Sequence, residues 1–201
     1  SELVAELLGP ALRDVLAAPD GALEINPDFA AGPVDAALAA VKARVAAVVA
    51  AIAASVDRWP AAYRFIGYCI RTRCEAARVP NPLACVAGFL ILRVVCPVVL
   101  QPHKHGLCGE RPSDAATRAL VVVCKIVQCV ANNTLPHEPY MRPLVGFVFE
   151  QAETMAGAMQ RFAQDRPARF AFADVGPAEL DASIRDLLGA WQRHADAVDA
   201  Y

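Results

Sequence analysis

Residues 88–97 read Gly-Phe-Leu-Ile-Leu-Arg-Val-Val-Cys-Pro, an apolar run with one ionised side chain, Arg93. The apolar stretch extends from Ala84 to Leu100, and Arg93 is its only clearly polar residue. This pattern predicts a core helix that ends near Pro97, because proline cannot continue the hydrogen bonding of a helix. A guanidinium in a core cannot lose its proton and therefore needs acceptors. We expect Arg93 to be buried, either as a structural strut or as part of a site.

The same stretch is apolar enough to raise the question of a membrane span. It is short for a span, carries its charge at the centre and contains Pro97. We also expect no second hydrophobic segment and no basic flank that would support insertion. The sequence therefore predicts a buried helix of a soluble domain and no intrinsic membrane segment.

Length and composition favour one sizeable domain, because the chain has 201 residues of which 56% are hydrophobic. The net charge of −2 gives no electrostatic reason to expect nucleic acid or an anionic membrane as partner. The 7 cysteines form no Cys-x-x-Cys pair, and no secretory signal is recognisable at the start. We predict a cytoplasmic protein with reduced thiols.

Apolar spacing predicts helices along the whole chain and no strand, so the expected fold class is all-α. Residues 33–56 are mostly alanine and valine and predict a long central helix, buried on most sides. Residues 114–132 predict a helix capped by Asp114, with an apolar face and an opposite polar stripe. That stripe consists of Lys125, Gln128 and Asn132. The other predicted helices cover residues 3–16, 61–78, 140–162 and 178–198.

Few residues have the spacing of a chemical site. His103-x-His105-x-x-Cys108 is similar to half of a zinc site, but no second cluster stands at a spacing that would complete the tetrahedron, so we expect no metal. No nucleophile elbow, phosphate loop or carboxylate pair is visible. On pattern alone, the stripe on residues 114–132 is more typical of a solvent-exposed face than of a binding site. We predict that the chain is not an enzyme.

Residues 88–97 resemble the Phe-Leu-Arg…Pro signature of the Ras GTPase-activating (RasGAP) domain family. Further motifs follow the order and spacing of that family between about residues 3 and 149: Leu7-Leu8-Gly9-Pro10, Leu23-Glu24-Ile25-Asn26-Pro27, Ser55-Val56-Asp57-Arg58-Trp59-Pro60, Lys125-Ile126-Val127-Gln128-Cys129-Val130-Ala131-Asn132 and Glu138-Pro139-Tyr140-Met141-Arg142-Pro143. The resemblance implies an elongated, multi-helix RasGAP-like domain over residues 1–163. We expect a linker at residues 164–177 and a C-terminal helix of unknown role at residues 178–201.

The resemblance further implies that the chain binds a GTP-loaded Ras-type small GTPase and stimulates GTP hydrolysis by it. GTP and Mg²⁺ belong to that partner, so the chain itself needs no cofactor. Its GTPase would recruit it from the cytoplasm to the inner membrane face. In the family, an arginine finger lies on a loop upstream of the motif at residues 7–10, and we expect these 201 residues not to include it.

Arg93 matches the second arginine of the family, which holds the finger loop in position. The positions that match GTPase contacts of the family are Leu92, Lys125, Gln128, Asn132, His137 and Glu138. His137 replaces a lysine of the family, which would weaken an ion pair near neutral pH. Two alternatives stay open: a scaffold that binds a small GTPase without accelerating hydrolysis, and a helical packing module whose groove binds nothing.

Overall fold

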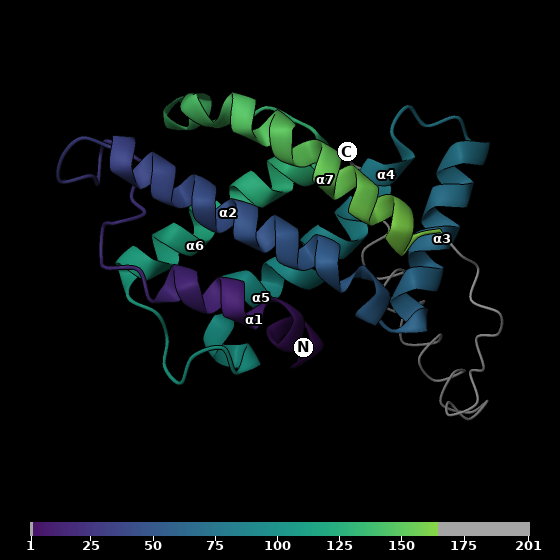
Figure 1. Cartoon of the computed structure of the whole chain (residues 1–201), viewed down its shortest axis with the longest axis horizontal. Helices are drawn as coiled ribbons and strands as arrows, with labels where there is room; N and C mark the ends of the chain where they lie inside the picture. Colours follow the sequence, from purple (N-terminus) through teal and green to yellow (C-terminus); the bar gives the residue numbers. More distant parts are fainter. Residues whose placement is uncertain (1, 165–201) are drawn as a thin grey trace, which may run out of the picture. The chain divides into compact units, whose positions relative to one another are not determined.

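The computed structural model describes residues 2–164 (Figure 1). Within this range the chain folds into helices without a strand, which confirms the all-α prediction. The α-helices are α1 (Glu2–Leu16), α2 (Asp35–Ser55), α3 (Ala61–Ala76), α4 (Pro82–Ala87), α5 (Cys96–Leu100), α6 (Asp114–Asn132) and α7 (Val145–Phe162). Three 3₁₀ turns are η1 (Val56–Arg58), η3 (Pro102–His105) and η4 (Pro139–Leu144), and a π-helical stretch is η2 (Gly88–Val95). The helix expected at 178–198, and the expected linker from residue 165 on, lie outside the described residues.

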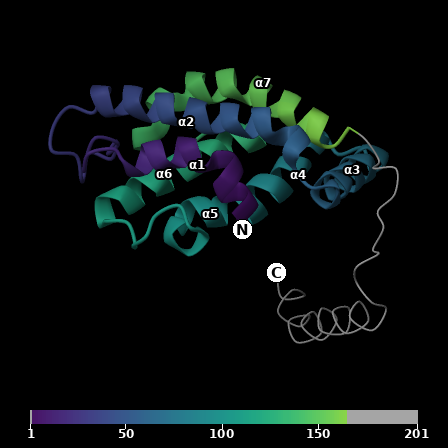
Figure 2. The same cartoon turned by 60° about the horizontal axis from the view of Figure 1, so that its bottom comes forward.

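The helices pack in two layers around one core. Helix α2 lies between α1 and α7, and α6 packs behind all three (Figures 1 and 2). The elements α4, η2 and α5 form one continuous helix, called helix 82–100 below, which packs along α6. Helix α3 lies at the edge of the domain and packs mainly on α4. The core therefore lies between α6 and the other long helices.

Helix α2 buries one face rather than most of its surface, so that part of the prediction is wrong. Its inward positions are occupied by larger side chains, which include Val41, Val45, Val48, Val49 and Ile52. Its exposed positions are Asp35, Ala36, Ala39, Ala43, Ala47, Ala50 and Ala54. Alanine has the highest helix propensity and little apolar area to hide, so an alanine face is stable in water.

The junction between α2, α3 and α7 is built on Trp59, which is fully buried. Its indole Nε1 donates to Ser55 Oγ at 3.3 Å, and its ring makes edge contacts with Tyr63 and Phe162. Helix α3 approaches this cluster so closely that a Cβ on Gly67 would lie 2.7 Å from the Phe162 ring. Glycine is therefore required at this crossing.

Helix 82–100 passes through Pro97 and ends at Leu100, not near Pro97 as expected. Pro97 stands in the first turn of α5, directly after the π-helical stretch η2. There the Cys96 N–H bonds to the Ile91 carbonyl, five residues back. A π-helical turn is wider than an α-helical one, and this gives the proline ring room that a regular helix lacks.

Two helices are long and apolar enough to cross a membrane by length and composition alone, over Asp35–Arg58 and Pro82–Leu100. The expectation of no second hydrophobic segment is therefore wrong. In the structure both helices contribute side chains to the same core, such as Val45 and Leu90. Core helices pass the same test of length and composition as membrane spans.

Candidate functional site

Helix α6 owes its regular geometry to local signals at both ends. Ser113 is the N-cap, and its Oγ accepts from the Ala116 N–H at 3.1 Å. Asp114, which we expected to be the cap, is the first helical residue, where its charge complements the helix dipole. Asn133 ends the helix in the left-handed region, at φ +52°. Between these ends the helical spacing is undisturbed.

The polar stripe of α6 lies where the sequence places it. Lys125, Gln128 and Asn132 are half-buried, whereas residues on the opposite side, such as Val123 and Ile126, are almost fully buried. The separation of α6 into an apolar and a polar face is thereby confirmed.

Lys125 and Glu138 form an ion pair, in which Lys125 Nζ donates to Glu138 Oε1. The hydrogen bond from Lys125 holds the pKa of Glu138 below its ordinary value, and the same bond raises the pKa of Lys125. Both side chains stay ionised at neutral pH. With exposed fractions of 40% and 30%, they are also accessible to a partner.

Gln128 ties the stripe to helix 82–100. Its Nε2 lies 3.4 Å from Cys96 Sγ and 3.6 Å from Cys124 Sγ. Hydrogen bonds from Cys124 and Gln128 lower the pKa of the Cys96 thiol to about 7, although burial acts in the opposite direction. The hydrogen bond to Cys96 raises the pKa of Cys124. The two helices therefore meet at a polar contact beneath the candidate face.

Arg93 is exposed, and the prediction that it is buried is wrong. Among residues 2–164 its guanidinium has neither a hydrogen-bond nor an ion-pair partner. Leu92 beside it is also 37% exposed, whereas Leu90 and Ile91 are fully buried. The π-helical stretch has more residues per turn than an α-helix, so side chains assigned inward by a period of 3.6 turn outward here.

The structure brings together only part of the predicted site. Lys125 contacts Glu138, and Gln128 contacts helix 82–100, as described above. His137 is exposed, and its charge adds to the lowering of the pKa of Glu138. Asn132 is half-buried at the end of the stripe. For Arg93, Asn132 and His137, no hydrogen bond or ion pair joins them to the other predicted residues within the described part of the chain.

One feature beside the stripe was missed by sequence reasoning. Glu24 is almost buried, and its Oε2 accepts from Arg118 Nε at 2.8 Å, which ties the loop before α2 to α6. The Arg118 guanidinium also lies 5.0 Å from the centre of the exposed Phe29 ring. The available signal was an acid inside the apolar triplet Leu23-Glu24-Ile25.

A cavity of about 210 Å³ opens between these residues and extends the α6 face beyond Lys125. Its lining includes Phe29, Arg118, Val121 and Tyr140. Val121 lies one helical turn before Lys125 on the same side of α6. The candidate face is therefore the outer side of α6 from Thr117 to Asn132, together with its neighbours Phe29, Tyr140 and Glu138.

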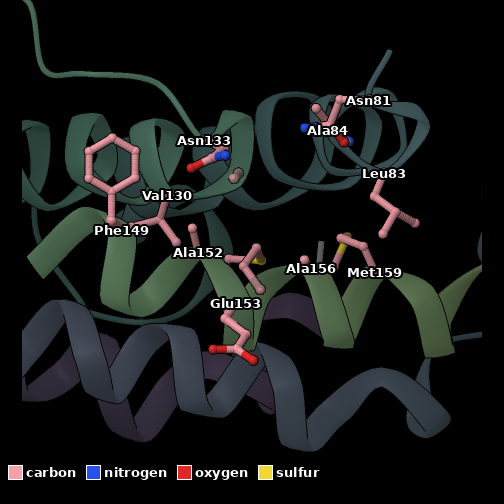
Figure 3. A pocket seen from close by; sticks show the side chains of 12 residues that line it. Asn81, Leu83, Ala84, Val130, Asn133, Phe149, Ala152, Glu153, Ala156 and Met159 are labelled. Atoms are coloured by element: carbon pink, nitrogen blue, oxygen red, sulfur yellow. The ribbon is translucent and has the colours of Figure 1, made fainter. Parts of the chain in front are cut away.

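A larger cavity, of about 340 Å³, lies elsewhere, between α4, α6 and α7 (Figure 3). Its lining is mostly apolar and includes Leu83, Val130, Phe149 and Met159, with Glu153 as the charged residue. None of the predicted site residues lines it.

No group of three or more His, Cys, Asp or Glu side chains among residues 2–164 is arranged to hold a metal ion. The cysteines of this range are free thiols. His103, His105 and Cys108 therefore have no fourth ligand of this kind beside them in the described part of the fold.

Comparison with known proteins finds a family match over part of the chain. Residues 33–132 match the family model "RasGAP: GTPase-activator protein for Ras-like GTPase". The matched segment includes Leu92, Arg93 and the whole polar stripe of α6, but not His137 or Glu138.

Individual relatives agree with the family model. Human Ras GTPase-activating protein 1 is 38% identical over 65 residues, which are 31% of this chain and 6% of that protein. Human RAS protein activator like-3 is 27% identical over 140 residues, 68% of this chain and 12% of that protein. A probable Ras GTPase-activating-like protein, ngap, from Dictyostelium discoideum is 33% identical over 73 residues, 35% of this chain and 8% of that protein. The similarity thus spans about a tenth or less of each relative's length.

Proposed function

We propose that this chain, whose residues 33–132 belong to the RasGAP family, binds a GTP-loaded Ras-type small GTPase and acts in stimulating GTP hydrolysis by that GTPase. The observation that carries the proposal is the family match over the segment that contains Arg93 and the α6 stripe. In this role the chain is a regulator, and the bond-breaking chemistry takes place on the GTPase with its own GTP and Mg²⁺. We expect it to act in the cytoplasm, at the membrane face where its GTPase resides.

The α6 face supports this proposal by its chemistry. Lys125 offers a cation, Gln128 an amide and Glu138 a carboxylate, beside apolar contact area on Phe29 and Val121. Interfaces of regulated, transient complexes commonly combine an apolar centre with ionised groups at the rim. Because Lys125 and Glu138 already hold each other in place, a partner charge would meet side chains with little remaining rotamer freedom.

Arg93 is assigned to a positioning role. Its guanidinium has five donors, is exposed, and is without a hydrogen-bond or ion-pair partner within residues 2–164. It is therefore free to donate to the carbonyls of a loop placed against helix 82–100. We propose that this loop carries an arginine finger and is supplied by sequence outside the 201 residues. In Ras itself an arginine finger is worth about 10³ to 10⁵ in kcat.

Within the family we expect neurofibromin to resemble the chain most, because of the residues of the motif at positions 88–97.

Binding to a GTPase tests the proposal first. The 201-residue chain is titrated into Ras loaded with a fluorescent, non-hydrolysable GTP analogue, and Kd is measured for the wild type and for Lys125→Glu. We expect the charge reversal to weaken binding by about tenfold or more, because it replaces attraction by repulsion at the α6 face. Arg73→Glu, an exposed site on α3, is the matched control and should leave Kd unchanged.

Circular dichroism of Lys125→Glu shows whether α6 stays folded. Equal Kd values for Lys125→Glu and the wild type would remove the α6 face from the interface. No binding of the wild-type chain to GTP-loaded Ras, Rap or related GTPases would contradict the proposal itself.

The role of Arg93 is tested in a longer protein that includes the finger segment. Arg93→Ala should lower the single-turnover rate of stimulated hydrolysis far more than it weakens binding, because it loosens the finger without touching the rest of the interface. An equal loss of rate and affinity would make Arg93 an ordinary contact residue. Binding without any rate enhancement by the longer wild-type protein would identify a scaffold.

A further inference from the structure

A third cavity, of about 310 Å³, lies at the end of helix 82–100, where the loop through η3 returns to the start of α6. Five polar side chains line it, together with the half-exposed Leu100: Gln101, His103, Lys104, Arg111 and Thr117. The family resemblance assigns none of these residues a role.

The charges around this cavity are one-sided. Lys104 and Arg111 are both exposed cations, and no carboxylate lines the cavity. Glu110 and Asp114 flank the loop in sequence, but neither belongs to the lining. Within residues 2–164, neither Lys104 nor Arg111 forms an ion pair, although the described surface ion pairs engage other cations such as Arg58 and Arg118. Two uncompensated cations at one hollow produce a positive potential that attracts an anion.

A buried polar atom beside these cations also has no partner. His103 Nδ1 is inaccessible to solvent and forms no hydrogen bond with the described residues. Buried polar nitrogens in native proteins are almost always hydrogen-bonded, so this atom has an unused hydrogen-bonding capacity next to the two cations. Burial, and then positive neighbours that include Lys104 and His103, lower the pKa of His105.

The loop that forms the cavity has a defined shape. Pro102 and Leu107 are buried beneath it, and the Leu107 N–H donates to the Pro102 carbonyl at 3.0 Å. Gly106 closes the turn at φ +74°, a conformation that side chains other than glycine rarely adopt. On the other side, Thr117 stands in the first turn of α6, where the helix dipole is positive. A preformed loop loses little entropy on binding.

We propose that this cavity binds a phosphate-bearing anion, a phosphomonoester or inositol phosphate group, held by Lys104, Arg111, His103 and Thr117. The arginine fork pairs with two phosphate oxygens, and the lysine acts as a point charge beside it. The hydroxyl of Thr117 and a protonated ring nitrogen of His103 are further donors. Lys104, Arg111 and His103 lie outside the proposed GTPase contact, and Thr117 is shared with the end of the α6 face. The phosphate site does not depend on the proposed function.

The test uses the 201-residue chain and inositol 1,4,5-trisphosphate in isothermal titration calorimetry at an ionic strength of about 0.15 M, where weak surface attraction is largely screened. Lys104→Gln/Arg111→Gln should weaken binding by about 10- to 100-fold, the effect of losing charge-assisted hydrogen bonds. Arg73→Gln/Arg142→Gln removes the same charge from exposed sites outside the cavity and should leave Kd unchanged. Thr117→Val, which keeps the net charge and nearly the shape, should weaken binding severalfold.

A vesicle experiment distinguishes the two sources of such a phosphate group, a lipid headgroup and a soluble compound. Co-sedimentation with phosphatidylcholine vesicles that contain phosphatidylinositol 4,5-bisphosphate would identify a lipid headgroup. Binding of the soluble trisphosphate without co-sedimentation would identify a soluble ligand, and both results support a phosphate site. The proposal is overturned if the wild type binds neither probe, or if the Arg73/Arg142 control weakens binding as much as the Lys104/Arg111 variant. It is also overturned if the Lys104/Arg111 variant binds both phosphate probes as tightly as the wild type does and loses affinity for the GTPase alone.

Discussion

Helix α6 and helix 82–100 pack along each other and are both rich in valine, yet their polar side chains are placed in different ways. In α6 the polar stripe falls where a period of 3.6 puts it, and the pair Lys125–Glu138 forms on its exposed side. In helix 82–100 the π-helical stretch changes the spacing in the middle, and Arg93 turns to solvent from an apolar run. Helix α6 carries several polar side chains and helix 82–100 only Arg93. In both helices the helical geometry decides where the charged side chains lie.

The difference teaches that an isolated charge in an apolar run is weak evidence for burial. A desolvated guanidinium is costly, and a chain can avoid that cost by a local change of helical pitch as well as by supplying acceptors. For Arg93 the change of pitch produces a free set of donors on the surface. Exposed donors suit a residue that hydrogen-bonds to a surface loop better than a residue that stabilises a core.

The largest expected effect separates two neighbours in helix 82–100. Ile91→Ala should lower the free energy of unfolding by about 2–5 kcal/mol, because Ile91 is fully buried and its removal leaves a cavity. Leu92→Ala should cost less than about 1 kcal/mol, since that side chain is 37% exposed. Urea denaturation of both variants measures the difference. Similar losses in both would mean that the π-helical register does not hold in solution.

A smaller effect tests whether α6 is regular because of its own ends. Ser113→Ala removes the oxygen that accepts from the Ala116 N–H and should cost about 0.5–2 kcal/mol of stability. Asp114→Ala keeps the Ser113 N-cap and should cost less, because only a charge at the helix dipole is lost. Thermal melts of both variants show which substitution is more destabilising. A larger loss for Asp114→Ala would restore Asp114 as the cap, as the sequence suggested.

Sequence reasoning succeeded best where one local rule acted alone. The long helices of the described range and the stripe on α6 follow from apolar spacing, whereas the burial of α2 was overestimated. It failed where two rules competed. Pro97 and Arg93 both disfavour a regular buried helix, and no single-residue preference says that the compromise is a π-helical stretch.

The sequence names candidate residues for the α6 face but not the contacts between them. Lys125 and Glu138 were each identified separately, and their pairing depends on how the loop after α6 folds back onto the helix. Glu24 and Arg118 are 94 positions apart, and no local pattern links them. Pairings of this kind require knowledge of which loops meet, and spacing along the chain carries no such information.

The pair Lys125–Glu138 should give α6 a contribution to stability that depends on pH in the acidic range. Because the pKa of Glu138 is lowered on folding, its contribution is present above the ordinary glutamate pKa of about 4.3 and is lost as the pH falls through the lowered value. Because the pKa of Lys125 is raised, its contribution is present below about 10.4 and is lost at higher pH. At neutral pH, Glu138→Gln should therefore cost about 0.2–1 kcal/mol, as for other exposed pairs.

Urea denaturation of wild type and Glu138→Gln at a series of pH values measures this contribution. The two free energies of unfolding should converge as the pH falls below about 4. Glu153→Gln, at an exposed carboxylate on α7, is the matched control and should follow the wild type throughout. A constant gap down to the lowest pH would show that the pair does not contribute through its charge.

The smallest expected effect is on Arg93 itself, and it bears most directly on the comparison of the two helices. Arg93→Ala in the 201-residue chain should change the free energy of unfolding by less than about 0.5 kcal/mol, because the side chain is exposed and has no polar partner within residues 2–164. A buried strut with satisfied hydrogen bonds would cost several times more on truncation. If denaturation shows such a loss, Arg93 is part of the core in solution. A negligible change in stability, together with a large loss of stimulated hydrolysis in the longer protein, leaves the holding of a loop as the role of this side chain.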